Sequence, residues 1–117
     1  MIQHQHWSED TRILITDEQN HGSVQVCIPN KAADKPTKYP ADALIHNLWV
    51  DKAHRRHGVA KLLLESAEKE AKDNGAESVA VSWDKADSPL WVLRWYERLG
   101  YEEKEFSAQS SLLVKRL

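Results

Sequence analysis

Residues 50–60, with the sequence VDKAHRRHGVA, hold the residue types best suited to chemistry in this chain. A strand pattern ends there, a basic loop follows, and Gly58 stands where a helical pattern begins. The loop contains Arg55, Arg56 and His57. The first N–H groups of a helix have no acceptor within the helix, and the helix dipole gives them partial positive charge. Such a place binds anions, and it suits a phosphate or a pyrophosphate best.

The residues alone leave two interpretations of Gly58 open. In the first, the missing Cβ lets the backbone approach a bound phosphate, and the neighbouring arginines hold that phosphate with paired hydrogen bonds. In the second, Gly58 makes a tight turn between a strand and a helix, and the arginines are a solvated edge. Two common phosphate-binding loops are excluded, because the chain has neither the Walker spacing nor the dinucleotide-binding spacing of glycines.

A longer pattern runs through the same loop. Arg55-x-x-Gly58-x-Ala60 resembles the acetyl-CoA signature of the GNAT superfamily of N-acetyltransferases, which reads Gln/Arg-x-x-Gly-x-Gly/Ala. In that family the signature follows a strand with a hydrophobic-x-Val ending, here residues 48–50 (LWV). A second segment, residues 95–101 (WYERLGY), is similar to the aromatic-Tyr-x-x-Leu-Gly-aromatic segment that ends a helix in the family. The resemblance covers residues 43–106, more than half of the chain.

The resemblance implies that acetyl-CoA is the co-substrate and gives the loop its roles. Arg55 would shape the loop, and backbone groups at the end of the preceding strand would bond the pantetheine arm and polarise the acyl carbonyl. That strand end consists of Leu48, Trp49 and Val50. The backbone N–H groups that would hold the pyrophosphate are those of Arg56, His57, Gly58, Val59 and Ala60.

Tyr96 is the predicted acid catalyst. The resemblance places its hydroxyl where it would protonate the leaving thiolate, and a tyrosine suits this task because it is rarely ionised near neutral pH. The alternative is a half-buried packing residue beside Trp95 and Leu99.

The sequence identifies the general base less clearly than the acid, because the chain differs from the family at the position where the base often lies. Family members often carry a glutamate on the central strand, and the matching residue here is Leu44. His46 lies two residues further on, so strand alternation would place it on the same face as Leu44 and Leu48. Histidine titrates in the right range to relay a proton. A base role for His46, a buried structural histidine and water acting alone all stay open.

Two further departures concern the substrate sites. Pro89 stands where an asparagine often contacts the pantetheine arm, so that contact is lost or passes to Ser88. Family members usually have two helices between their first strands, whereas only a short polar turn, residues 17–22, separates two strand patterns here. The acceptor would then meet an open face, the loop at residues 29–40, or a second subunit of a homodimer.

The helices and strands that position these residues are predicted from the periodicity of apolar residues and from the positions of glycine and proline. The order of strands, helix, strand, helix, strands predicts an α/β (α+β) fold in one domain, residues 1–117, with a mixed sheet and helices packed on it. The resemblance adds a GNAT-like, mostly antiparallel sheet with a splayed central strand pair and without the usual first helix pair. Ser88 is the predicted N-cap of the second helix, with Pro89 as its first residue. The expected strands are residues 1–7 at an edge, 11–16, 23–28, 43–50, 77–83, 102–106 and 111–117; the expected helices are 58–74 and 89–99.

Composition narrows the classes of function. A net charge of -2 argues against a general nucleic-acid binder, although the loop is a local basic patch. No apolar run reaches the about 20 residues of a membrane span, and the polar first ten residues are unlike a secretory signal, so we expect a cytoplasmic protein without membrane contact. Cys27 is the single cysteine, and the six histidines have no metal-binding spacing, so we expect no metal. Most of the five tryptophans are expected in the core, with Trp83 or Trp91 lining a pocket as an alternative.

The leading prediction is an N-acetyltransferase that moves an acetyl group from acetyl-CoA to a primary amine by direct attack. The acceptor is a small molecule or a peptide, and its identity stays open. The main alternative is a CoA-binding module without catalysis that acts as a sensor or partner. A third reading, nucleic-acid contact through the basic loop, is disfavoured by the negative net charge.

Overall fold

The computed structural model describes residues 2–6, 10–17, 19–29, 41–55, 58–86, 88–106 and 109–117, with only the backbone described at residues 6, 105 and 106. The described residues form one seven-stranded sheet and two α-helices. In chain order the elements are β1 (Ile2–His6), β2 (Asp10–Thr16), β3 (Gly22–Pro29), β4 (Ala43–Val50), the 3₁₀ turn η1 (Lys52–His54), α1 (Val59–Asp73), β5 (Ser78–Asp84), α2 (Leu90–Arg98), β6 (Glu102–Phe106) and β7 (Ser110–Arg116).

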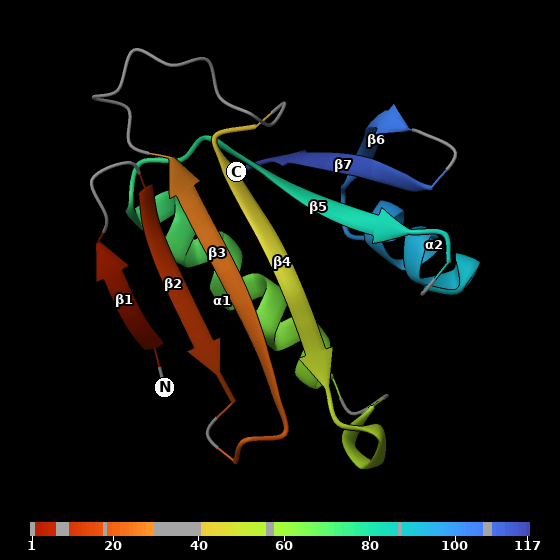
Figure 1. Ribbon diagram of the computed structural model, residues 1–117, viewed down its shortest axis with the longest axis horizontal. Coiled ribbons are helices and arrows are strands. Elements are labelled where there is room, and N and C mark those ends of the chain that lie inside the picture. The colour runs from red at the N-terminus through yellow and green to blue at the C-terminus, as the bar shows by residue number, and fades with distance from the viewer. Residues whose placement is uncertain are drawn as a thin grey trace.

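The strand order is β1-β2-β3-β4-β5-β7-β6, and every neighbouring pair is antiparallel except β4 and β5. This confirms the predicted mixed, mostly antiparallel sheet. Figure 1 shows that β1–β4 form one half of the sheet and β5, β7 and β6 form the other, and that the halves diverge from a common end where β4 and β5 pair.

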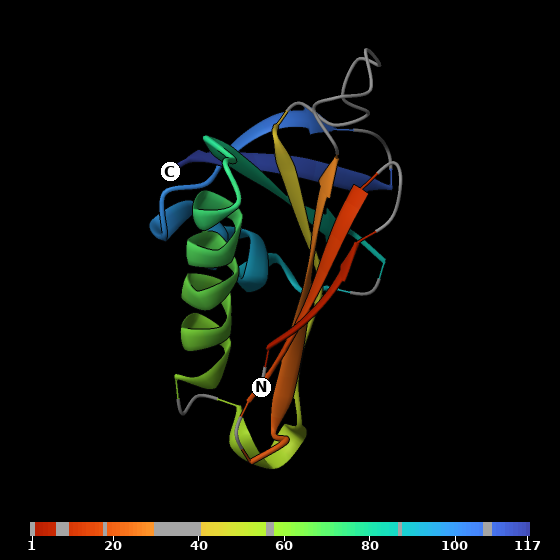
Figure 2. The ribbon, with the colours of Figure 1, turned by 90° about the vertical axis from the view of Figure 1, so that its left-hand side faces the viewer.

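Helix α1 covers one face of the sheet, where it contacts β2, β3, β4 and β5 (Figure 2). Leu63, Leu64, Ala67 and Ala71 are buried and form its apolar stripe. The helix ends at a left-handed glycine: Gly75 has φ +92° and its N–H bonds the carbonyl of Lys72 at 3.0 Å, while the N–H of Ala76 bonds that of Ala71 at 2.9 Å. The buried faces of β2, β3 and β4 meet this stripe and form the core with it.

Helix α2 begins one residue later than predicted. Pro89 is its N-cap and Leu90 its first residue, so the prediction of Ser88 as N-cap was wrong. The reason is local: the N–H of Ser88 is bonded to the carbonyl of Asp84 at 2.9 Å, in the turn that leaves β5, and Pro89 still has an extended ψ of 156°. Tyr96 and Leu93 are the buried residues of the helix, and the sequence pattern had not singled out Leu93.

The amino-terminal half of the described chain is built from strands. β1 is an edge strand, and the turn after β2 makes a hairpin with β3, both as predicted. Among the described residues no helix except η1 precedes α1, in agreement with the predicted lack of a first helix pair. Most of the predicted loop, residues 30–40, lies outside the described ranges. No described helix is long and apolar enough to cross a membrane.

Candidate active site

The central strand pair separates along its length, as predicted. β4 and β5 pair only at Ala43–Ile45 against Val79–Val81, although β4 continues to Val50 and β5 to Asp84. Beyond Ile45 the edge of β4 that faces β5 therefore has no strand partner in the described part of the chain. Peptide groups on such an edge can bond an extended ligand between the two strands.

A β-bulge in β4 changes which side chains face which way. Asn47 has a φ of +53°, and the register against β3 shifts so that His46 lies opposite Gln25 and Trp49 lies opposite Ser23. The extra residue reverses the alternation after Asn47. The expectation that His46 and Leu48 share a face was therefore wrong: Leu48 packs against the core, whereas His46 and Trp49 lie on the opposite face, and Trp49 is half exposed.

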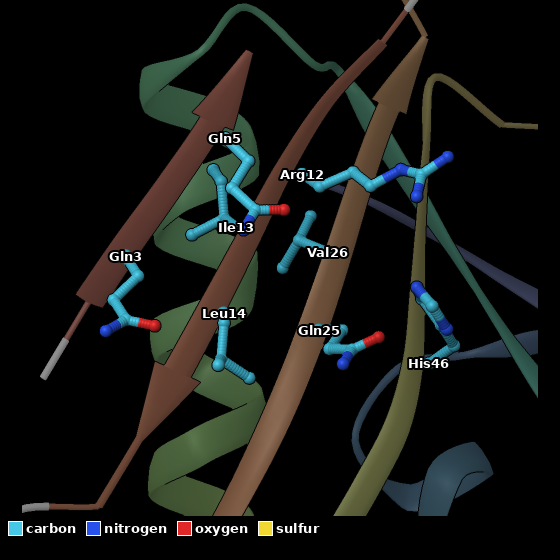
Figure 3. Close-up of a pocket in the computed structure, with 8 residues that line it drawn as sticks. All are labelled: Gln3, Gln5, Arg12, Ile13, Leu14, Gln25, Val26 and His46. Atoms are coloured by element: carbon cyan, nitrogen blue, oxygen red, sulfur yellow. The ribbon is translucent and has the colours of Figure 1, made fainter. Parts of the chain in front are cut away.

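His46 lines a pocket on the face of the sheet opposite α1. Figure 3 shows its ring over β4, with the Arg12 side chain reaching across β3 toward the same strand. Gln3, Gln5 and Gln25 supply amide groups to the same pocket. Burial, reinforced by the positive charge of Arg12, lowers the pKa of His46 below its ordinary 6.5. The imidazole is therefore neutral at pH 7 and able to accept a proton. Arg12 is far from His46 in the sequence, and no motif marks it as a neighbour of that histidine.

The loop after β4 is fixed by its own polar side chains. Asp51 caps η1, because its carboxylate accepts hydrogen bonds from the backbone N–H of His54 at 3.0 Å and from the ring Nδ1 of His54 at 2.6 Å. Arg55 donates from Nε to the carbonyl of Val50 at 3.1 Å, which ties the end of the loop to the end of the strand. Arg56 and His57, both predicted to contact the pyrophosphate, lie outside the described residues.

Gly58 is the N-cap of α1 and adopts a left-handed conformation, with φ 80° and ψ 2°. The first bond of the helix runs from the N–H of Leu62 to the carbonyl of Gly58 at 3.1 Å. The N–H groups of Val59, Ala60 and Lys61 precede that bond and have no acceptor inside the helix. A Cβ built on Gly58 meets no atom of a described residue within 4 Å, so the described chain leaves the space beside it open.

Tyr96 is buried on the helix side of the sheet, between Trp95 and Tyr101. Its hydroxyl makes no hydrogen bond to any described residue. The neighbouring Tyr101, in contrast, donates to Glu68 at 2.7 Å. Burial raises the pKa of Tyr96 to about 12, so the hydroxyl keeps its proton at any ordinary pH. Of the two tyrosines, Tyr96 is the one whose proton is not already donated within the described chain.

Two tryptophans and Ser88 lie where β5 leads into α2. Trp83 is buried and donates from Nε1 to the carbonyl of Pro89 at 3.2 Å, so it supports the helix start. Trp91 is 64% exposed. Ser88 is half-buried, and its side chain does not cap the helix.

The fold also brings together a histidine–aspartate cluster that sequence reasoning missed. His21, Asp51 and His54 each present a ligand atom within 4.8 Å of the others. His21 lies in the turn between β2 and β3, far in sequence from Asp51 and His54 in the loop after β4. The spacing of these residues therefore does not predict the cluster. The predicted absence of a metal site rested on that missing spacing.

Residues 7–103 match the family model described as an acetyltransferase (GNAT) domain. No curated protein sequence is significantly similar. Among solved structures, an acetyltransferase from Bacillus cereus has a TM-score of 0.66 at 21% identity, over 93% of this chain and 74% of that chain. PaiA N-acetyltransferase from Thermoplasma acidophilum, in complex with coenzyme A, has a TM-score of 0.68 at 16% identity, over 93% and 62%. The NatC complex bound to Gag peptide and CoA has a TM-score of 0.65 at 17% identity, over 92% and 70%.

Proposed function

The chain belongs to the GNAT acetyltransferase family, and from this premise we propose that it acetylates a primary amine by direct attack of the amine on acetyl-CoA. It is an acyl-CoA-dependent N-acyltransferase with acetyl-CoA as its co-substrate. The direct mechanism, the residues that carry it and the nature of the acceptor are the proposal.

The observation that carries the proposal is the opening between β4 and β5. It starts where strand pairing stops, at Ile45 and Val81, and the loop that ends at Gly58 leaves the far end of β4. An extended arm with a pyrophosphate at one end fits this arrangement, because unpaired strand edges can bond the arm and free helix N–H groups can bond the phosphates. Arg55 holds the loop through the carbonyl of Val50.

In the proposed reaction a neutral amine attacks the thioester carbonyl, a carbon–nitrogen bond forms and the carbon–sulfur bond breaks. The amine proton leaves to His46 or to water, and Tyr96 donates its proton toward the departing sulfur, so the products are an amide and CoA thiol. His46 suits its role because it is neutral. Tyr96 suits its role because its hydroxyl is protonated and not engaged by a described residue.

Binding of the co-substrate should be visible without any acceptor. Acetyl-CoA and CoA are both expected to raise the melting temperature by on the order of 10 °C at a hundredfold excess over Kd, since a ligand that binds only the folded state stabilises it. CoA should do nearly as well as acetyl-CoA because the pyrophosphate carries much of the recognition. Thermal unfolding with each ligand checks this, and no shift at millimolar concentration of either would contradict the proposal.

Activity is then tested by screening amines with acetyl-CoA and following release of the CoA thiol. Peptide amino termini, lysine, polyamines and aminoglycosides cover the main classes of acceptor. The resemblance to NatC, which holds a peptide with CoA, makes peptide amines the first class to test. The acceptor would approach the open face of the sheet around His46, and a second subunit of a homodimer is a further way to complete its site.

The second candidate is a CoA-binding module without catalysis. Leu44 favours it, because relatives often carry a glutamate at the matching position. A clear thermal shift with CoA together with no thiol release for any class of amine would favour this candidate over the enzyme.

The role of His46 can be separated from packing by its pH dependence. A base must be neutral to act, and the pKa of His46 is lowered, so wild-type kcat/KM should fall on acidification through a limb below pH 6.5. His46→Gln should lower activity and lose that limb. The ratio of wild-type to variant kcat/KM, measured from pH 5 to 9, removes the effect of the acceptor's own protonation. A ratio that stays constant with pH would assign His46 to packing.

A further inference from the structure

The cluster of His21, Asp51 and His54 lies where the turn between β2 and β3 meets the loop after β4. The rings of His21 and His54 are stacked, with centroids 3.3 Å apart and planes within 9° of parallel. The backbone N–H of Asp51 bonds the carbonyl of His21 at 2.7 Å, which holds the two segments together. Asp17 lies beside the pair, with Oδ2 3.7 Å from Nδ1 of His21.

The cluster sets two imidazole rings beside two side-chain carboxyl groups. Nδ1 of His54 lies 2.6 Å from Oδ1 of Asp51, and Nδ1 of His21 lies 3.7 Å from Oδ2 of Asp17. Imidazole nitrogens and carboxyl oxygens are both atoms that bind metal ions in proteins.

We propose that His21, Asp51 and His54 form a binding site for a divalent transition-metal ion, with Zn²⁺ as the ion that matches the ligands best. Imidazole nitrogen and carboxylate oxygen are ordinary ligands of Zn²⁺, at about 2.0–2.2 Å. In tetrahedral coordination such bonds place neighbouring ligand atoms about 3.3 Å apart. The three ligand atoms already lie within 4.8 Å of one another, so small side-chain movements suffice. Water would complete the coordination.

Two adjustments accompany binding. The proton that His54 shares with Asp51 at 2.6 Å is released, and the metal ion takes its place between nitrogen and oxygen. The stacked rings rotate until their lone pairs converge on the ion. The partial exposure of both side chains, 24% for His21 and 37% for His54, leaves room for this. Asp17 can accept the other ring N–H of His21 and fix its orientation, as outer carboxylates do for metal-bound histidines.

The site would join two segments that are distant in sequence. His21 belongs to the β2–β3 turn, whereas Asp51 and His54 begin the loop that ends at Gly58. A bound ion would therefore cross-link that loop to the sheet. This inference rests on the cluster alone and does not depend on the proposed acetyl transfer.

Calorimetric titration with Zn²⁺ tests the site directly. The wild-type protein should bind one ion per chain that Mg²⁺ does not replace, because Mg²⁺ prefers an all-oxygen site. Saturating Zn²⁺ should raise the melting temperature by on the order of 10 °C at a hundredfold excess over Kd, reversed by a chelator. Co²⁺ in place of Zn²⁺ should give the visible absorption of a tetrahedral nitrogen–oxygen site.

The variants assign the ion to the cluster. His21→Gln/His54→Gln should abolish the binding, and Asp17→Asn should weaken it by about 10- to 100-fold, the usual effect of an outer-shell partner. His4→Gln is the matched control, because it removes a histidine of β1 outside the cluster and should leave Kd unchanged. Zn²⁺ binding that survives in His21→Gln/His54→Gln, or that is lost in His4→Gln, would overturn the assignment, as would a wild-type protein that binds no Zn²⁺.

Discussion

Replacing Gly58 with alanine should weaken CoA binding by about 100-fold or more. The Cβ would enter space beside Gly58 that the described residues leave open, and the pyrophosphate is proposed to lie there. Hydrogen bonds to a charged group contribute about 1.5–3 kcal/mol each, so displacing the phosphates from two backbone N–H groups accounts for a loss of that size. The variant should also lose about 1–2 kcal/mol of stability, because Gly58 has a left-handed φ of 80°. Calorimetric titration with CoA and thermal unfolding measure the two effects separately.

Two further variants separate the ligand effect from the backbone effect. Asparagine tolerates the left-handed region, as Asn20 and Asn47 do in this chain with φ 59° and 53°. Gly58→Asn should therefore recover stability but still bind CoA weakly. Gly75, at the other end of α1, also has a positive φ and open space in front of it. Gly75→Ala should lose similar stability and bind CoA like the parent. If Gly58→Asn binds CoA like the parent, Gly58 is an ordinary turn and the phosphate site is elsewhere.

Tyr96→Phe should lower turnover by about 100- to 1000-fold while CoA binding is kept, as expected when a general acid is lost. The phenyl ring preserves the packing against Trp95 and Tyr101, and no described residue loses a hydrogen-bond partner. Because the pKa of Tyr96 is raised to about 12, the hydroxyl is protonated throughout the accessible range. The loss should therefore be the same at every pH from 6 to 10, measured as the ratio of wild-type to variant kcat.

Tyr101→Phe is the control for this experiment. It removes the hydroxyl that donates to Glu68, but Lys115 still contacts that carboxylate at 3.1 Å. A modest loss of stability, on the order of 1 kcal/mol, with turnover near that of the parent is expected. Comparable losses of turnover in both variants would mean that Tyr96 acts through packing and not through its hydroxyl.

Several elements of the fold and the family signature could be predicted from short stretches of sequence. The expected helix at residues 58–74 matches α1, Val59–Asp73, to within one residue at each end, and the expected strand at residues 43–50 has the bounds of β4. The signature around Gly58 and the segment around Tyr96 led to the family that the comparison of the whole domain then showed. These features depend on backbone preferences and side-chain periods within one element, which neighbouring residues suffice to set.

Other features depend on how separate segments meet. The bulge at Asn47 places Leu48 in the core and leaves His46 with Arg12 on the other face, because the register between β3 and β4 overrides simple alternation. The pocket of His46 needs β1, β2, β3 and β4 side by side.

The sequence by itself was sufficient to predict the order of strands and helices, the phosphate loop and the tyrosine near the end of a helix, because each of these depends on residues that are close together in the chain. Tertiary structure alone decided that Gly58 is left-handed and that His21 stacks on His54. It also decided that the hydroxyl of Tyr101 donates to Glu68, whereas that of Tyr96 has no partner among the described residues. These features depend on how segments that are distant in sequence pack together. For this reason the spacing of residues along the chain does not predict them.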